Sequence, residues 1–380
     1  MAEGSQGRRA GLAAVEAWIE REVQRLGAEP VALAQAQGRV VAADVVAPAP
    51  LPPVDRAALD GIALGAAATV GAGAYNPITL RLGTEAHVVA AGDALPAGTD
   101  AVATLDQAQR AGATCEIIEA VAPGSQVERA GAQLAAGALV VAAGRRLDAV
   151  GLGLLAAAGI AALAVVCRPR VRILLAGPPG TRDSDGPMLG ALVARDGGTL
   201  EAIRMLGRDR AALARALVAP GADLVLVVGG TGPGADDGAA AALAQAGTLA
   251  IHGMALRPGD TAGLGRVDSV PVALLPGAPA ACLWAYEMAA GRALRRLAGR
   301  PPGLPLPSRR AVTARKLVSA IGLVEICPVA LRDDGAVEPV AGFAEAGLAA
   351  TLRADGIVIV PEGREGHAQG SEVVVYLLGS

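Results

Sequence analysis

A glycine-rich segment, residues 229–237 with the sequence GGTGPGADD, is the part of the chain best suited to chemistry. It follows the apolar run 223–228, which has the composition of a buried strand. Glycines after a strand let backbone N–H groups turn toward an anion such as a phosphate. The same spacing also fits a tight turn that binds nothing and carries an aspartate cap, and it is neither a Walker A nor a GxGxxG pattern.

Two further loops have the same character, since each follows an apolar run and precedes an expected helix. Residues 176–188 (AGPPGTRDSDGPM) offer Asp183 and Ser184, and residues 275–279 (LPGAP) place Pro276 and Gly277 before a long helix. In a parallel sheet such loops gather at the carboxyl ends of the strands, where helix N-termini favour anions. Ordinary helix capping explains each loop equally well.

Two charged positions elsewhere are weaker candidates. Arg257, in the run Arg-Pro-Gly-Asp, would bring a guanidinium beside a phosphate, and Asp60 follows a proline-rich segment from which a mobile loop could reach a partner site. Surface arginines and turn aspartates are common in all proteins. Neither residue indicates a site by itself.

The elements that must position these loops alternate along the chain. Apolar runs at 171–176, 223–228, 248–252 and 271–275 predict strands, and the segments 189–195, 239–246 and 278–297 predict helices. Alternation of this kind predicts a parallel sheet covered on both faces. Short Val, Ile and Leu runs between turns predict a small β-rich, barrel-like unit over 61–143, and further strands are expected at 311–328 and 356–378.

We therefore predict an α/β multidomain fold of four parts. Residues 1–50 and 144–168 form a helical and extended N-terminal domain, and residues 51–143 form a β-rich inserted domain. Residues 169–303 form a three-layer α/β/α domain, and residues 304–380 form a β-rich C-terminal domain. The proline-rich segments 48–53 and 300–307 have the composition of linkers.

Composition excludes several classes of protein. The 380 residues carry a net charge of -3 without a basic block, so a nucleic-acid partner is not expected. Lys316 is the only lysine, which excludes a P-loop lysine and an SxxK acyl transferase. Four cysteines without a CxxC pair do not fit a structural zinc site and instead fit reduced thiols in a cytoplasmic protein.

One uncharged stretch, residues 149–167, has arginines at both ends and the length of a membrane span. Its many alanines and glycines, with Gly159 in the middle, favour a buried helix over 147–158 followed by a strand over 161–166. The polar N-terminus leads into an amphipathic pattern, which indicates a helix and not a signal peptide. We expect no membrane association.

Taken in order, five segments resemble the molybdopterin molybdotransferase family, also called MoeA and known in animals as the gephyrin E domain. Residues 51–63 (LPPVDRAALDGIA) are similar to its PPFDNSAMDGYA segment, residues 92–102 to its TGxxLPxGADAV turn, and residues 223–237 to its DxxxxxGGxSxGxxD loop. Residues 257–259 and 275–279 are similar to its KPGKP and LPGNP motifs. The resemblance covers nearly the whole chain, and an ordered set of five is far more specific than one glycine turn.

The resemblance implies a cytoplasmic homodimer that inserts molybdate into adenylylated molybdopterin, releasing AMP with Mg²⁺ present. It implies catalytic roles for Asp60, Asp236 and Asp237, with Asp60 and Asp237 near the metal. The implied molybdopterin-binding residues are Gly229, Gly230, Thr231, Gly232, Gly234, Asp183, Ser184, Arg257, Pro276 and Gly277. A molybdoenzyme or another protein of cofactor biosynthesis is the expected protein partner.

Several positions depart from the family pattern. The TGDEL motif is AGPPG at 176–180, the GED motif is GAQ at 131–133, and the DSN motif is Asp183-Ser184-Asp185. Arg257 and Asp260 replace the two lysines of KPGKP, and Ala278 replaces the asparagine of LPGNP. Because Pro and Ala neither bind a metal nor accept a proton, chemistry should suffer more than binding. The alternative is a catalytically impaired paralogue that binds molybdopterin or delivers the cofactor to a specific molybdoenzyme, and a purely structural dimer is a third hypothesis.

Overall fold

The computed structural model describes residues 9–177, 183–234, 237–340 and 347–379. The chain divides into two compact units, one containing Met1–Ala28 and Val166–Ser380 and the other Glu29–Val165. The predicted division into four domains is finer than this, and it stays a prediction. Asp236 and residues 178–182, which belong to two of the predicted site loops, lie outside the described residues.

A six-stranded sheet forms the centre of the first unit, in the order β14-β13-β15-β19-β18-β16. Its strands are β13 (Arg170–Leu175), β14 (Thr199–Met205), β15 (Leu224–Val228), β16 (Thr248–His252), β18 (Gly263–Val267) and β19 (Val270–Leu275). The first four in the order are parallel, whereas β18 and β16 are antiparallel to their neighbours. The expectation of a parallel sheet is therefore wrong for one strand, β18, which runs opposite to its neighbours β19 and β16. A turn of two residues joins β18 to β19, and so short a connection must reverse the chain direction.

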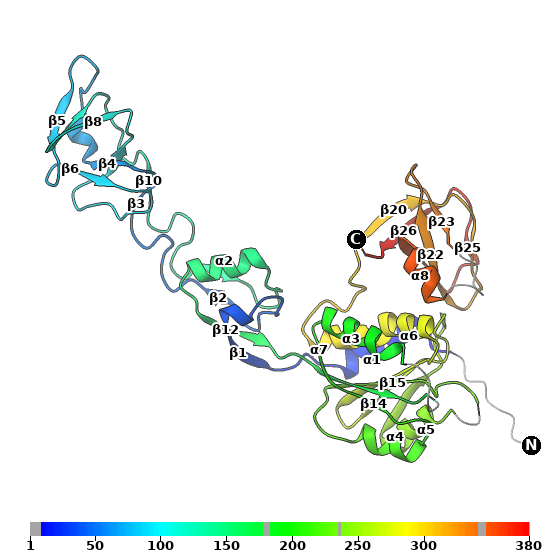
Figure 1. The fold of residues 1–380 in the computed structure, drawn as a ribbon. Helices are drawn as coiled ribbons and strands as arrows, with labels where there is room; N and C mark the ends of the chain where they lie inside the picture. Colours follow the sequence, from blue (N-terminus) through cyan, green and yellow to red (C-terminus); the bar gives the residue numbers. More distant parts are fainter. Residues whose placement is uncertain (1–8, 178–182, 235–236, 341–346, 380) are drawn as a thin grey trace, which may run out of the picture. The chain divides into compact units, whose positions relative to one another are not determined.

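Helices cover both faces of this sheet (Figure 1). One face carries α1 (Leu12–Glu22), α3 (Asp185–Arg195) and a long helix composed of α6 (Pro279–Ala285), a π-helical turn (Tyr286–Ala290) and α7 (Gly291–Leu297); the other carries α4 (Arg210–Leu217) and α5 (Ala239–Ala246). Successive strand residues point to opposite faces, so Ile173 packs in the core of the first face and Leu174 in that of the second. The predicted three-layer α/β/α arrangement is confirmed.

Two strands of this sheet, β14 and β18, have no counterpart among the predicted strands. Of these, β14 lies at the edge, and its Leu200, Ile203 and Met205 remain exposed. An edge strand with an exposed face lacks the continuous apolar run by which the inner strands are recognised. By contrast, β16 and α5 have the predicted bounds.

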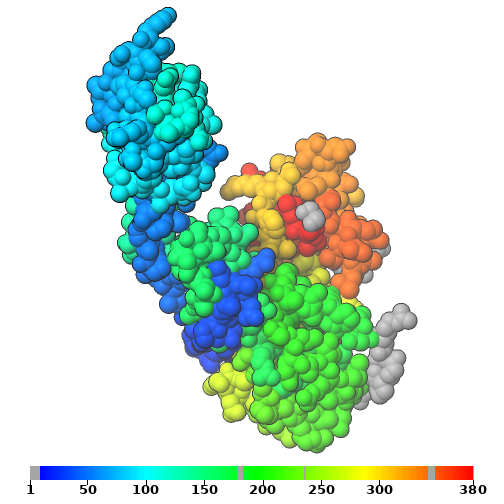
Figure 2. All heavy atoms as spheres, turned by 60° about the vertical axis from the view of Figure 1, so that its left-hand side comes forward, coloured from blue at the N-terminus to red at the C-terminus, as the bar shows by residue number. Residues whose placement is uncertain are grey.

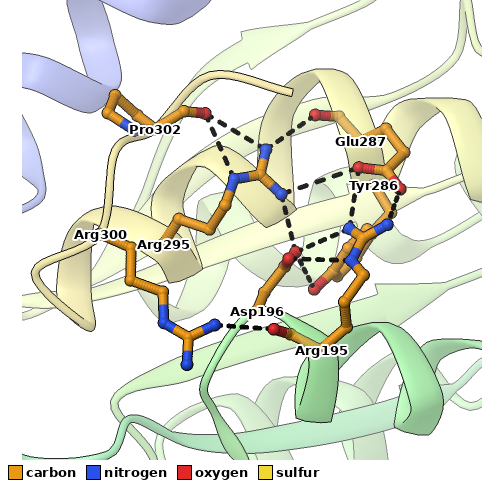
Figure 3. A network of polar contacts seen from close by, with 7 residues as sticks. All are labelled: Arg195, Asp196, Tyr286, Glu287, Arg295, Arg300 and Pro302. Carbon is orange, nitrogen blue, oxygen red and sulfur yellow. Dashed lines mark hydrogen bonds and ion pairs between the residues drawn. The ribbon is translucent and has the colours of Figure 1, made fainter. Parts of the chain in front are cut away.

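A buried polar network joins the end of α3 to the long helix (Figure 3). Asp196 accepts hydrogen bonds from Arg295 at 2.7 Å and from the Tyr286 hydroxyl at 3.0 Å, and Arg195 donates to Glu287 at 2.6 Å. The side chains of Asp196, Glu287 and Arg295 are each 3% exposed or less. Two arginines face two carboxylates, so the network is balanced in charge and fixes α3 against the π-helical turn.

A second sheet of the first unit has the order β17-β22-β24-β26-β20. Its strands are β17 (Leu256–Arg257), β20 (Ser308–Val312), β22 (Val324–Leu331), β24 (Gly356–Val360) and β26 (Glu372–Leu377), with β23 (Val337–Pro339) beside β22; β21 (Leu317–Val318), β25 (Gly366–His367) and α8 (Leu348–Arg353) complete this part. Val324 and Ile326 pack in the same core as Trp284 of α6. The expected β-rich C-terminal part is confirmed.

The second unit consists of small sheets. In it β4 (Gly61–Leu64) pairs with β6 (Ala86–Val89) and β7 (Ala101–Ala103), and β9 (Thr114–Ile117) pairs with β5 (Ile78–Arg81) and β8 (Ala108–Ala111). Side chains of these strands, such as Ile62 and Ile117, share one core. This part of the chain is drawn in cyan in Figure 2. Two-stranded pairs form the rest: β1 (Ala28–Ala32) with β12 (Ala162–Val166), β2 (Val45–Val46) with β11 (Leu139–Val141), and β3 (Arg56–Ala57) with β10 (Val127–Glu128).

The uncharged stretch 149–167 folds as α2 (Ala149–Ala157) followed by β12, as predicted. Gly159 has a φ of +75°, a left-handed conformation typical of the residue after a helix end. Only Gly151 and Leu155 of α2 are buried, so the expectation of a buried helix is wrong and α2 lies at the surface. None of the helices in the described ranges combines the length and the apolar character of a membrane span.

Gly61, the first residue of β4, gives a test of the packing in the second unit. A Cβ atom at this position would lie 2.3 Å from the carbonyl oxygen of Ala103 on the neighbouring β7. We expect Gly61→Ala to lower the stability of this unit by about 1–3 kcal/mol, because the two strands must separate. Thermal unfolding followed by circular dichroism measures the loss. At Gly65 the nearest atom would be 3.5 Å away, so Gly65→Ala is the matched control; equal unfolding midpoints would contradict the packing described here.

Candidate functional site

A pocket of about 490 Å³ opens in the first unit where β13, β15 and β19 end. Its lining includes nine of the residues predicted from the sequence: Asp183, Ser184, Gly229, Gly230, Thr231, Gly232, Asp237, Pro276 and Gly277. The three loops come together because the parallel strands that precede them all end at the same edge of the sheet.

The glycine loop directs backbone amides into this pocket. Gly229 and Gly230 have φ angles of +85° and +64°, and two consecutive left-handed residues form a concave turn that favours anions. The N–H of Gly229 bonds to the carbonyl oxygen of Leu275 and thus belongs to the sheet. Within the described ranges, no acceptor takes the N–H groups of Gly230, Thr231 or Gly232. These three donors are left for a ligand.

Asp237 folds back over the same loop. Its Oδ2 atom accepts the N–H of Gly234 at 3.1 Å, and a Cβ at position 232 would lie 2.6 Å from that oxygen, so the carboxylate requires a glycine there. The capping residue of α5 is Gly238, and its cap includes no side-chain hydrogen bond. The interpretation of Asp237 as a helix cap is therefore wrong. Gly234 is not among the lining residues, and its N–H is already used.

The loop before α3 holds two aspartates with different surroundings. Asp183 accepts the N–H of Gly186 at 2.7 Å, so it caps the first turn of α3 as well as lining the pocket. Asp185 is 9% exposed, and its Oδ1 atom has no hydrogen-bond partner among the described residues. Burial, and next the negative charge of Asp183, raise the pKa of Asp185 to about 6.

Two further residues of the pocket are absent from the sequence-based candidates. Arg208 lies in the loop after β14, and this loop is easily overlooked because β14 has no apolar run. The available signal is the triplet 207–209 (GRD), in which Asp209 caps α4. Thr261 also lines the pocket, and its hydroxyl lies 2.9 Å from that of Thr231. Among its described lining residues the pocket thus has one cation, Arg208, and three neutral hydroxyl groups, those of Ser184, Thr231 and Thr261.

Arg257 is not among the residues that line the pocket. Its Nε atom lies 3.0 Å from both carboxylate oxygens of Glu325, a residue of β22 whose side chain is only 2% exposed. Arg257 belongs to β17, which pairs with β22, so this ion pair joins two adjacent strands of the second sheet. Asp260 receives a hydrogen bond from Arg9 at 2.7 Å, which partly compensates the negative charge expected to repel a ligand. The predicted contact of Arg257 with a phosphate stays a prediction.

Asp60 lies in the second unit, where its Oδ1 atom accepts the N–H of Ala91 at 2.8 Å. Its side chain is exposed at the surface of that unit. Nowhere in the described ranges do three or more His, Cys, Asp or Glu side chains form a group that could hold a metal ion. The metal-binding role of Asp60 stays a prediction.

Comparison with known proteins agrees with this geometry. Residues 11–159 match the "MoeA N-terminal region (domain I and II)", residues 164–296 the "Probable molybdopterin binding domain", and residues 310–378 the "MoeA C-terminal region (domain IV)". The "Molybdopterin molybdenumtransferase 2" of Mycobacterium tuberculosis is 32% identical over 326 residues, which are 77% of this chain and 80% of the relative. The chain belongs to the MoeA family.

Two further MoeA-type relatives extend the match over almost the full length. The "Molybdopterin molybdenumtransferase" of Haemophilus influenzae is 24% identical over 371 residues, covering 90% of this chain and 91% of the relative. A solved MoeA structure from Pyrococcus horikoshii matches with a TM-score of 0.80 at 26% identity, covering 97% of this chain and 99% of that one. The pocket residues of this MoeA-family chain all lie within the segment matched as a molybdopterin binding domain.

Proposed function

We propose that this MoeA-family protein acts in molybdenum cofactor biosynthesis by inserting molybdate into adenylylated molybdopterin, with release of AMP. The observation that carries the proposal is the set of three unused amides, at residues 230–232, in a pocket at the carboxyl ends of parallel strands. Relatives named as molybdenumtransferases support a transferase, and they do not favour a paralogue that only binds or delivers the cofactor.

Backbone amides, an arginine and two hydroxyl groups of the pocket each contribute to binding the pterin phosphate. The amides of Gly230, Thr231 and Gly232 donate to the phosphate of the pterin, and these donors are fixed before the ligand arrives, so little ordering accompanies binding. Arg208 supplies positive charge on the same pocket, and the hydroxyls of Thr231 and Thr261 add neutral donors. A ligand held in this way has its phosphate fixed, while its reacting end extends along the pocket.

A magnesium ion fits this donor set only in part. Mg²⁺ is usually bound by one or two carboxylates together with substrate phosphates, and not by a cage of protein ligands. Asp237, which lines the pocket, would hold it with phosphate oxygens of the substrate, whereas the metal-binding role of Asp60 in the second unit stays a prediction from the family resemblance. The ion would neutralise part of the phosphate charge.

We also propose a cytoplasmic homodimer that passes its product to a molybdoenzyme or to another protein of cofactor biosynthesis.

Arg208 offers a direct test of the phosphate site. We expect Arg208→Gln to weaken molybdopterin binding roughly tenfold, because a charge-assisted contact to phosphate is lost. Binding is measured by quenching of tryptophan fluorescence. Arg215→Gln on α4, outside the pocket lining, removes the same charge and should leave the affinity unchanged. Equal losses of affinity in the two variants would mean that the overall electrostatic field of the protein, and not a contact of Arg208 with the phosphate, determines the affinity.

The proposed reaction itself is tested with purified protein, adenylylated molybdopterin and molybdate. We expect AMP to be released only when molybdate is present, and we expect the gene to restore molybdoenzyme activity in a bacterial strain that lacks its own molybdotransferase. Tight pterin binding without AMP release would instead identify a binding protein. Absence of pterin binding would identify a structural dimer.

A further inference from the structure

Asp185 is a pocket carboxylate that the proposed function leaves unused. It is the first residue of α3, it lines the pocket, and it is 9% exposed. Its buried Oδ1 atom has no hydrogen-bond partner in the described part of the chain. Leaving a buried polar atom unpaired is unfavourable, so each such atom in a native protein requires an explanation, of which a bound ligand is one.

The charges around the pocket make this atom more unusual. Among the described lining residues, Asp183, Asp185 and Asp237 carry three negative charges against the single positive charge of Arg208. Asp183 and Asp237 each accept a backbone N–H, from Gly186 and Gly234. The Oδ1 atom of Asp185 accepts none within the described ranges, and as a carboxylate Asp185 would repel the anion that the glycine loop attracts.

We propose that Asp185 is a ligand-binding residue that donates a hydrogen bond from its protonated carboxyl group to the bound phosphate, so that the ligand and a proton bind together. The inference rests on the proposed function for the identity of the ligand. In the bound state the carboxylate has taken one proton from solvent, and its O–H points to a phosphate oxygen. The repelling charge becomes a donor, and the unpaired oxygen gains a partner.

The surroundings of Asp185 favour this protonated form. Burial and the charge of Asp183 raise its pKa to about 6, and a phosphate beside it would raise it further. The thiol of Cys282 on α6 stays neutral, since burial and then the charge of Asp185 raise its pKa. A bound cation is the competing explanation for an unpaired carboxylate; it predicts that Asp185→Asn weakens sulfate binding, whereas a protonated donor predicts the opposite.

The test uses sulfate, which keeps its double charge from about pH 5 to about pH 8 and therefore isolates the titration of the protein. We expect the dissociation constant for sulfate, measured by calorimetry on the full chain, to rise at least tenfold between about pH 6 and about pH 8. Asp185→Asn has nearly the same shape and a donor that does not titrate. It should bind sulfate with little pH dependence, and at about pH 8 it should bind at least tenfold more tightly than the natural protein.

His252 is the main competing titratable group, because its Nε2 atom lies 3.0 Å from the carbonyl oxygen of Thr231 in the glycine loop. The control His252→Gln should keep the pH dependence of sulfate binding. Arg208 and Asp237 also face the pocket, and both are retained in Asp185→Asn, so the comparison with this variant separates their contribution from that of Asp185.

The possible outcomes separate this inference from the proposed function. A flat pH profile in the natural protein, or weaker sulfate binding by Asp185→Asn, would overturn the inference while leaving molybdopterin binding to be measured independently. A pH profile abolished by His252→Gln would assign the titration to the histidine and would also overturn it. If sulfate binds with the expected profile and molybdopterin does not bind at all, the role of Asp185 stands and the proposed function fails.

Discussion

Gly230→Asp is expected to abolish ligand binding more completely than any other single change in the pocket. The substitution places a carboxylate beside the amides that hold the phosphate, and two like charges about 4 Å apart repel by about 4 kcal/mol at an effective dielectric constant of about 20. Molybdopterin affinity should therefore fall about 100- to 1000-fold. Fluorescence quenching on the purified protein measures the loss, and complementation of a strain lacking molybdotransferase should fail.

Two controls separate charge from backbone strain. Gly230 has a positive φ, which Asn and Asp tolerate to a similar degree, so Gly230→Asn introduces nearly the same shape without the charge and should cost about tenfold or less. Gly322 also has a positive φ, and a Cβ atom added there would meet no other atom of the described residues within 4 Å, so Gly322→Asp tests the same strain and charge away from the pocket. Equal loss of binding in Gly230→Asn and Gly230→Asp would show that repulsion of an anion is not the cause.

The second large effect is expected on stability, from Asp196→Ala in the buried network of Figure 3. Asp196 pairs with Arg295 at 2.7 Å, and both side chains are almost completely buried. Removing the carboxylate leaves the arginine with Glu287 as its remaining charged partner, 3.7 Å away. Breaking one partner of a buried pair leaves an uncompensated charge, so we expect a loss of about 3–5 kcal/mol in the free energy of unfolding.

The two tryptophans make this measurement specific. Trp18 and Trp284 pack in the same core of the first unit, so their fluorescence during urea unfolding follows the part of the molecule that contains the network. Glu372→Ala is the control, because it breaks an ion pair with Arg310 whose side chains are 59% and 80% exposed. Such a surface pair contributes less than about 1 kcal/mol. A loss of this small size for Asp196→Ala would show that the network adds nothing beyond a surface contact.

The sequence alone determined three inner strands of the sheet, β13, β15 and β19, the helices that follow them, and the three pocket loops between them. Apolar runs mark the inner strands because both of their faces are buried, and glycines mark the turn because positive φ angles require them. The ordered motifs were sufficient to identify the MoeA family, which the family models confirm. Apolar runs, glycine turns and motifs depend on residues that are neighbours in the sequence, so one amino-acid sequence is enough to reveal them.

Only the tertiary structure decided which polar groups are free. Asp183 and Asp185 are two residues apart and chemically identical, yet one caps α3 and the other keeps a buried oxygen without a partner among the described residues. Arg208 reaches the pocket from the loop after an edge strand that has no apolar pattern, while Arg257 of β17 forms its ion pair with Glu325 on the adjacent strand β22. Hydrogen-bond partners and burial depend on segments far apart in the chain, so the residue types and their spacing do not specify them.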